Sequence, residues 1–416
     1  KIKGTEVKGK VTMLTHFKEK YIGSASFYKR YLCLALPMIL QNAITNLVSF
    51  LDNIMVGQLG TEPMSGVAIV NQLIFVYNLA IFGAVSAASI FGAQYFGKGN
   101  HKGHMHSFRF KLYASLTMTA ATILLFITKG STLISLYLTD TTGSGATEAA
   151  LQYGLEYLAI MMIGLIPFAI NQSYATNIKE TGQTLIPMIA SFAAVGINAV
   201  LDYLLIFGLG PIPKMGVIGA ALATVIARYI EALIVIVWAH TNRAKNQYLE
   251  GAYRGFGIPK AEFKAILIKG LPLMLNEVFW AAGMTTVTQC YSVRGLEVIA
   301  GLNIATTITN LFNIIYIQLG GCISIVVGQY LGAGKLKEAK DADNKMIVFS
   351  VFCCAIVAGV MLMFGGLFPQ IYNTSEEIKA LATSFIAVSA IIMPFCSFSH
   401  ASYFTLRSGG KTMVTF

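Results

Sequence analysis

Long apolar stretches separated by short polar segments dominate the chain. Six of these stretches carry almost no charge, at 31–51, 63–97, 157–178, 298–334, 346–375 and 380–406. A helix needs about 20 apolar residues to cross the hydrocarbon core of a membrane, whereas a barrel strand needs about half that number. Shorter or interrupted stretches lie at 112–128, 181–201, 215–239 and 266–292. The pattern therefore predicts ten complete membrane-spanning helices.

Composition supports an integral membrane protein and excludes an ordinary soluble domain. Hydrophobic residues make up 55% of the chain, charged residues only 12%, and the mean hydropathy is +0.65. All six cysteines fall inside predicted spans, where we interpret them as small buried hydrophobes, and no disulfide framework is implied.

The net charge of +11 does not point to nucleic acid, because the basic residues lie in loops on one side. Alternating spans place 25 of the 30 Lys and Arg residues on the side of the N-terminus and four on the opposite side. This asymmetry predicts a cytoplasmic N-terminus. The expected partners are the lipid bilayer and small molecules, with no nucleic acid, and we expect a monomer.

Two segments recur 235 residues apart. LPMIL at 36–40 returns as LPLML at 271–275, and QYFG at 94–97 returns as QYLG at 329–332. Six spans separate the copies, so the copies share one orientation, which predicts two parallel-repeat six-helix bundles. The expected domains are an N-terminal segment (1–27), an N-lobe (28–239), a cytoplasmic linker (240–259) and a C-lobe (260–416).

A complete second copy would continue about 50 residues beyond Phe416, so twelve spans are expected, of which the chain holds ten and the start of the eleventh. In the linker, we expect Tyr248, Tyr253 and Phe256 to lie at the membrane interface.

Two carboxylates near the ends of spans are candidate functional residues. Asp52 and Asp202 lie near the outer ends of the first and fifth spans, so their depths match. Asn198 lies one turn before Asp202 on the same helix face, and Asn71 and Gln72 fall near that depth. Carboxylates inside a membrane are costly and usually functional, and two that lie close together cannot both stay ionised cheaply. The sequence therefore predicts a polar, proton-binding pocket in the N-lobe.

Four motifs in order resemble the multidrug and toxic compound extrusion (MATE) transporters of bacteria, in the MOP superfamily. They are DNIMVGQLG at 52–60, GAQYFG at 92–97, NAVLD at 198–202 and GAALAT at 219–224. The resemblance implies that Asp52, Asn198 and Asp202 form a cation site in the N-lobe, and it adds Thr224 to the ion-coupling residues. No cofactor and no catalytic residue is implied; the coupling ion is H⁺ or Na⁺, and no metal site is expected beyond a possible Na⁺ at the Asp52 and Asp202 cluster.

The second bundle contains Glu277 in span seven and His400 in span ten as candidates for a substrate or second-lobe site. The resemblance implies a glutamate in span seven and an acid in span ten, but here the glutamate comes about one turn early and span ten carries a histidine. Glu277 could bind a cationic substrate or a proton. His400 is interpreted first as a satisfied histidine between helices and second as a titrating group.

Other polar features are given a structural interpretation. The histidines of KGNHKGHMH (98–106) are expected to lie in a solvated basic loop rather than in a metal site, and Arg228 and Glu231 are expected to form a structural pair. No paired nucleophile and base lies in the spans, so an enzyme is not expected.

The resulting hypothesis is a multi-pass antiporter of the inner (plasma) membrane. It would export varied, often cationic amphipathic compounds in exchange for protons or sodium, by rocking two bundles about a central cavity. The alternative is a flippase of the same superfold for lipid-linked oligosaccharides or cell-wall precursors. A flippase cavity should be basic in order to hold pyrophosphate, whereas the ionisable residues in these spans are largely acidic.

Overall fold

The computed structural model describes residues 19–138, 146–208, 213–255, 257–372 and 374–415. Within these residues the chain forms helices and no strand, and ten of the helices are long and apolar enough to cross a membrane. The predicted all-helical membrane fold with ten spans is therefore confirmed. The ten helices are α2 (Ala25–Gly57), α3 (Thr61–Gly97), α4 (His101–Ser135), α5 (Ala146–Glu180), α6 (Leu185–Phe207), α7 (Val217–Thr241), α8 (Lys260–Ser292), α9 (Leu296–Gly332), α10 (Leu336–Phe364) and α11 (Glu376–Ser408). Three short helices complete the described elements: η1 (Gln247–Leu249), η2 (Phe368–Ile371) and α12 (Thr412–Thr415).

The helices differ from the apolar stretches mainly at their ends. The stretch at 346–375 predicts a span that runs to Ser375, but α10 ends at Phe364. Two glycines follow, and the short helix η2, with Pro369 in its first turn, comes before α11. Glycine and proline interrupt helices regardless of hydrophobicity, so the apolar run is longer than the helix. At its other end α10 begins ten residues before the apolar stretch, with a polar first turn.

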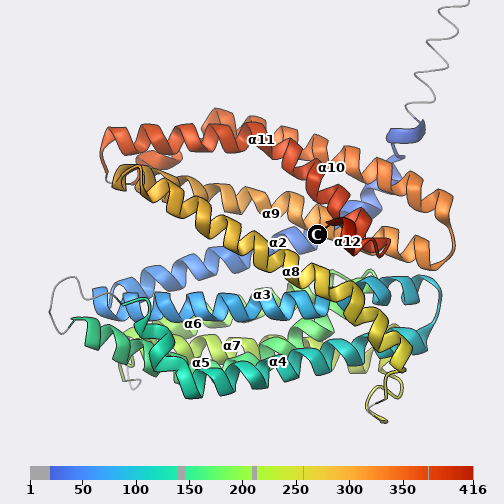
Figure 1. Cartoon of the computed structure of the whole chain (residues 1–416), viewed down its shortest axis with the longest axis horizontal. Coiled ribbons are helices and arrows are strands. Elements are labelled where there is room, and N and C mark those ends of the chain that lie inside the picture. The colour runs from blue at the N-terminus through green and yellow to red at the C-terminus, as the bar shows by residue number, and fades with distance from the viewer. Residues whose placement is uncertain (1–18, 139–145, 209–212, 256, 373, 416) are drawn as a thin grey trace, which may run out of the picture. The chain divides into compact units, whose positions relative to one another are not determined.

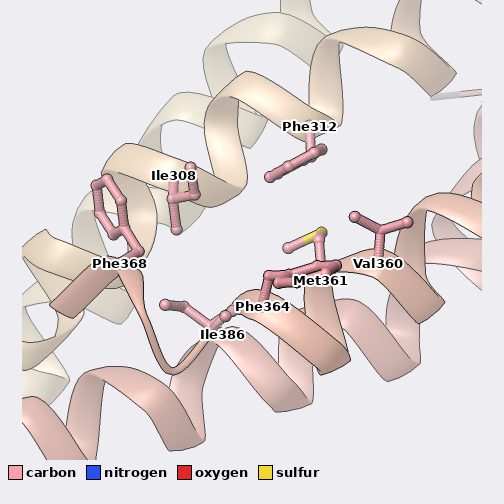
Figure 2. A pocket seen from close by; sticks show the side chains of 8 residues that line it. Ile308, Phe312, Val360, Met361, Phe364, Phe368 and Ile386 are labelled. Carbon is pink, nitrogen blue, oxygen red and sulfur yellow. The ribbon is translucent and has the colours of Figure 1, made fainter. Parts of the chain in front are cut away.

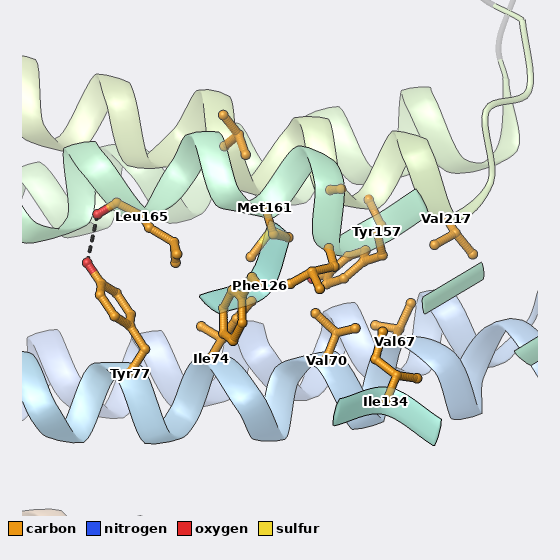
Figure 3. Packing of buried hydrophobic residues seen from close by; sticks show 14 of the residues in the cluster. Val67, Val70, Ile74, Tyr77, Phe126, Ile134, Tyr157, Met161, Leu165 and Val217 are labelled. Atoms are coloured by element: carbon orange, nitrogen blue, oxygen red, sulfur yellow. Dashed lines mark hydrogen bonds between the residues drawn. The ribbon is translucent and has the colours of Figure 1, made fainter. Parts of the chain in front are cut away.

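The chain divides into two compact units. Unit 2 comprises residues 40–92 and 101–274, and in it α5 packs against α4 and α7 while α6 packs against α7 (Figure 1). Its largest core joins residues of α3, α4, α5 and α7, among them Val70, Ile74, Ile134 and Met161 (Figure 3). The Tyr77 hydroxyl donates to the Leu165 carbonyl across 2.9 Å, so this core is tied by a buried polar contact as well as by packing.

Unit 1 comprises residues 1–39, 93–100 and 275–416, of which the first 18 lie outside the described part. In it α9, α10 and α11 pack against one another (Figure 1). The fully buried Cys322 and Cys354 belong to its two cores, which agrees with the interpretation of cysteines as small hydrophobes. Cys33 and Cys290 are exposed on the protein surface instead.

The repeated QYFG and QYLG segments meet inside unit 1, where the end of α3 crosses the end of α9. A Cβ atom on Gly97 would overlap the backbone of Gln329, and one on Gly332 would overlap the backbone of Gln94. The contact is thus reciprocal, because the glycine of each copy lies against the glutamine of the other. The side chain of Gln94 also donates to the carbonyl of Ser408 across 2.7 Å. Only glycine allows two helix backbones to approach so closely.

The predicted linker is folded onto unit 2. Arg109, only 6% exposed, donates to the carbonyls of Gly251 (2.7 Å), Ala252 (2.8 Å) and Gly257 (2.8 Å). Tyr248 is 1% exposed and packs in a core with Phe108, and burial raises the pKa of its phenol.

The expectation that Tyr248 lies at the membrane interface is therefore wrong, because its ring fills a core. Tyr253 is 55% exposed, and Phe256 lies outside the described residues.

Candidate functional site

Two carboxylates meet between α2 and α6, near the end of the bundle where both helices finish. The side chains of Asp52 and Asp202 interact with each other, and Asn198 acts on Asp202 from one turn earlier on the same helix, although its Nδ2 makes no hydrogen bond. Asp202 is 1% and Asn198 5% exposed, because both belong to the buried stripe of α6. That stripe follows the helical period through Pro187, Ser191, Ala194, Asn198, Asp202 and Ile206.

Three polar atoms of the acid pair and the neighbouring Asn198 are buried without a hydrogen-bond partner. They are Oδ1 of Asp52, Oδ2 of Asp202 and Nδ2 of Asn198. Two ionised carboxylates about 4 Å apart repel by about 4 kcal/mol at an effective dielectric constant of about 20. This repulsion lowers the population of the doubly ionised pair by a factor of about a thousand. The pair is therefore stable with a proton or another cation between the two carboxylates.

Tyr157 extends the cluster and was missed in the sequence. It is 5% exposed, interacts electrostatically with Asp52 and Asp202, and donates through its hydroxyl to Oδ1 of Asn71 across 3.3 Å. Tyr157 therefore links Asn71 to the acid pair. A tyrosine at the first position of the stretch 157–178 was the available signal, because a buried phenol usually finds a polar partner.

Two other predicted residues lie apart from this network. Thr224 donates its hydroxyl to the carbonyl of Ala220 on its own helix, across 3.0 Å. Gln72 is exposed, and no hydrogen bond ties it to the acid pair in the described part of the chain. The helical period accounts for the difference between neighbours, since Asn71 and Gln72 point about 100° apart around α3.

The two candidates of the second lobe do not form a pair. Glu277 lies on α8, and Arg407 is the charged group that acts on it. His400 packs edge-on against the ring of Tyr316, 4.7 Å between centroids, and its Nδ1 lies 3.1 Å from the carbonyl oxygen of Cys396. Within the described residues no ion pair or hydrogen bond joins Glu277 to His400.

A buried charged cluster lies where α4 begins and α5 ends. Lys111, 0% exposed, donates to Oε1 of Glu180 and to Oδ1 of Asn177, each across 2.5 Å. Nε2 of His104 lies 3.3 Å from the other carboxylate oxygen of Glu180. The expectation of a solvated basic loop at 98–106 is therefore wrong from His101 onward: α4 starts there, and His104 is 1% exposed.

The reason for this error is that an ion pair can satisfy a charge inside a core, and composition alone does not reveal the partner. Glu180, the partner of Lys111, comes 69 residues later in the chain.

A small pocket lies among α9, α10, η2 and α11 of unit 1 (Figure 2). Its volume is about 110 Å³, and every side chain that lines it is apolar, including Phe312, Met361, Phe368 and Ile386. A specific ligand site needs a few polar groups that fix orientation. This pocket offers none, so it does not compete with the acid pair as a candidate site.

Comparison with known proteins gives a family match and a shared fold. The MatE family model matches residues 37–204 and 272–416. The "Probable multidrug resistance protein NorM" of Thermotoga maritima is 24% identical over 92% of this chain and 81% of the relative. The protein of the same name from Oceanobacillus iheyensis is 28% identical over 86% of this chain and 78% of the relative.

Solved structures show the same fold. A multidrug resistance MATE family transporter of the MOP superfamily, in an outward-facing conformation, superposes with a TM-score of 0.83 at 20% identity and covers 93% of this chain and 84% of its own. A MOP superfamily transporter from Pyrococcus furiosus gives a TM-score of 0.79 at 20% identity, with coverage of 93% and 84%.

Proposed function

Because the chain belongs to the MatE family of membrane transporters, we propose that it exports varied, often cationic amphipathic compounds in exchange for protons. It is a transporter and not an enzyme, and the ten apolar helices of its described part make it a multi-pass membrane protein of a bacterium. We propose in addition that protons are the coupling ion and that the protein lies in the plasma membrane.

The contact between Asp52 and Asp202 carries the proposal of proton coupling. A buried carboxyl pair holds one proton far more easily than two charges, so it binds and releases a proton when its surroundings change. The uncompensated atoms of Asp52, Asp202 and Asn198 are acceptors and donors that a proton or a small cation would engage. Sodium remains the rival ion, since carboxylate oxygens also bind hard cations.

The mechanism that we propose is a competition between protonation and export. A proton that enters from the outside neutralises the acid pair, which relieves the repulsion between α2 and α6 and lets the two helices repack. The repacked state binds the compound more weakly, so the compound is released and the transporter returns inward. Binding of the next compound favours the state that gives up the proton.

The names of the relatives support a broad range of compounds. The acidic groups of the spans favour cations over the pyrophosphate carriers that a flippase would hold. A lipid-linked pyrophosphate offered in the same binding assay tests that alternative, and tight binding of it would favour the flippase.

The test measures binding of a fluorescent organic cation to purified protein between about pH 6 and about pH 8. If one proton is exchanged for one compound, the dissociation constant of the wild type changes up to tenfold per pH unit. Asp52→Asn and Asp202→Asn should flatten this dependence, because a single remaining carboxyl no longer shares a proton. Glu250→Gln, an exposed acid outside the spans, is the matched control and should behave as the wild type. Binding that ignores pH in the wild type would refute proton competition.

A further inference from the structure

A second set of polar contacts in unit 2 links three helices by hydrogen bonds. The side-chain amide of Gln41, on α2, donates to Oγ of Ser191, on α6, across 2.7 Å. The hydroxyl of Ser191 in turn donates to Oε1 of Glu231, on α7. Oε1 of Gln41 is buried and has no hydrogen-bond partner. These two hydrogen bonds therefore run from an amide donor to a carboxylate, and the Gln41 carbonyl oxygen is an acceptor that neither bond uses.

These hydrogen bonds lie at the same spacing from the acid pair on both α2 and α6. Gln41 precedes Asp52 by eleven residues on α2, and Ser191 precedes Asp202 by eleven residues on α6. Eleven residues make three turns, which is about 16 Å along the axis and a return to nearly the same face. Polar side chains of α2 and α6 therefore meet at two depths, and a carboxyl group takes part at each depth.

Glu231 and Arg228 interact electrostatically, but the described part of the protein shows no direct ion pair between them. Arg228 lies one turn earlier on α7, but its guanidinium donates to the carbonyl of Gly164 across 3.4 Å and lies 5.3 Å from the ring centre of Phe168. In the described part of the chain Glu231 takes part in no ion pair. The expected structural pair of Arg228 and Glu231 is therefore not a contact.

Other titratable groups face the arginine. Tyr157 on α5, Tyr77 on α3 and Glu231 itself act on Arg228 electrostatically, while Ser191 is the group of α6 that faces Glu231. A carboxylate inside a membrane with no ion pair is costly, so its presence indicates a function.

We propose that Glu231 is a second proton-binding site of the transporter, with Ser191 and Gln41 as its hydrogen-bond relay. When Glu231 is ionised, its oxygen accepts from Ser191, which accepts from the Gln41 amide. When Glu231 takes up one proton, its new O–H donates to Ser191, and the Ser191 hydrogen turns toward Gln41. A half-turn of the Gln41 amide then presents Oε1, the acceptor that is otherwise unpaired.

The reversal of these hydrogen bonds shows how a proton can be held here without loss of a partner. Each protonation state keeps both hydrogen bonds, so the contact between α2 and α6 survives proton uptake and release. No other atom gains or loses a bond: one proton enters from the aqueous phase and ends on a Glu231 oxygen. The acid pair lacks this relay, because Oδ1 of Asp52 and Oδ2 of Asp202 face no hydroxyl partner.

The test follows protonated carboxyl groups by infrared spectroscopy on the full chain in lipid vesicles, titrated between about pH 4 and about pH 10. We expect Glu231→Gln to lose one carboxylic-acid carbonyl band that remains in Asp202→Asn. Ser191→Ala should keep that band but shift its frequency, because the acid loses its hydroxyl partner. Glu250→Gln, which alters an exposed acid, is the control and should leave the band unchanged.

The inference deepens the proposed proton coupling, yet it can fail separately from it. Spectra of Glu231→Gln that match the wild type throughout the titration would overturn the Glu231 site, even if Asp202→Asn abolishes pH-driven transport. Loss of the band in Glu231→Gln supports the site, even if the wild type proves to be driven by sodium. An unchanged band frequency in Ser191→Ala would overturn the relay.

Discussion

The crossing of α3 and α9 allows a sharp test of how the repeated segments work. The perturbation is a single methyl group, introduced by Gly97→Ala or by Gly332→Ala. At Gly97 the new Cβ would lie 2.6 Å from Cα of Gln329, and at Gly332 it would lie 2.7 Å from Cα of Gln94. Both obstacles are backbone atoms, so no side-chain rotation can relieve them.

The size of the effect follows from these distances. Carbon atoms in contact prefer about 3.5–4.0 Å, so the two helix ends must separate by about 1 Å. Overpacking of this kind typically costs about 1–3 kcal/mol. If only one conformation of the transporter brings the helix ends together, either alanine shifts the equilibrium away from it by about 5- to 150-fold.

The assay uses spin labels attached to cysteines that replace Lys98 and Lys335. Both lysines are exposed and follow the two crossing segments. The exposed Cys33 and Cys290 are first replaced by serine so that they do not react with the label. We expect weaker dipolar broadening in Gly97→Ala and Gly332→Ala than in the parent. Gly359→Ala on α10 is the control, because a Cβ there meets no atom within 4 Å.

Alanine is itself a better helix former than glycine by about 1 kcal/mol, so Gly359→Ala should keep the parent spectrum and should not lower the melting temperature. Spectra of Gly97→Ala and Gly332→Ala that equal the control would mean that the two helix ends separate without cost, and that the glycines are not needed for their contact.

Three further outcomes follow from buried contacts. Lys111→Met should lower the stability by about 3–5 kcal/mol, because Glu180 stays buried without its cation, and Lys111→Met combined with Glu180→Met should recover much of the loss in a thermal melt. Arg109→Lys should speed tryptic cleavage after Arg254, because the single ammonium of lysine does not reproduce the planar fork with which the guanidinium reaches the carbonyls of Gly251, Ala252 and Gly257; an unchanged cleavage rate would contradict this role of Arg109. Tyr157→Phe should weaken stability by about 1 kcal/mol through loss of its hydroxyl contact, and an unchanged melting temperature would show that this contact contributes nothing.

Much of the architecture was open to prediction because hydrophobicity decides it. A span requires about 20 apolar residues whatever its neighbours are, so ten helices could be counted without any contact information. The meeting of Asp52 and Asp202 was also within reach, because two helices that run in one direction and end alike place equal positions at equal depth. Their part in ion coupling stays a prediction.

The remaining contacts depend on partners that the sequence does not name. The sequence counts Lys111 among the basic residues of the loops, and only the fold shows that Glu180 is its partner. Arg228 and Glu231 lie one turn apart on one helix, but the guanidinium donates to the carbonyl of Gly164 and lies over the ring of Phe168. Rotation of each helix about its axis decides such pairings, and spacing along one helix does not fix that rotation.

We propose that protons enter the transport cycle through the acid pair, and transport in proteoliposomes is the measurement that decides this. A fluorescent organic cation is followed while a pH gradient or a sodium gradient is imposed alone, on the wild type and on Asp52→Asn. We predict that the pH gradient alone drives the wild type and that Asp52→Asn, folded and still able to bind the compound, is not driven. A requirement for sodium, or normal pH-driven transport by Asp52→Asn, would contradict the account.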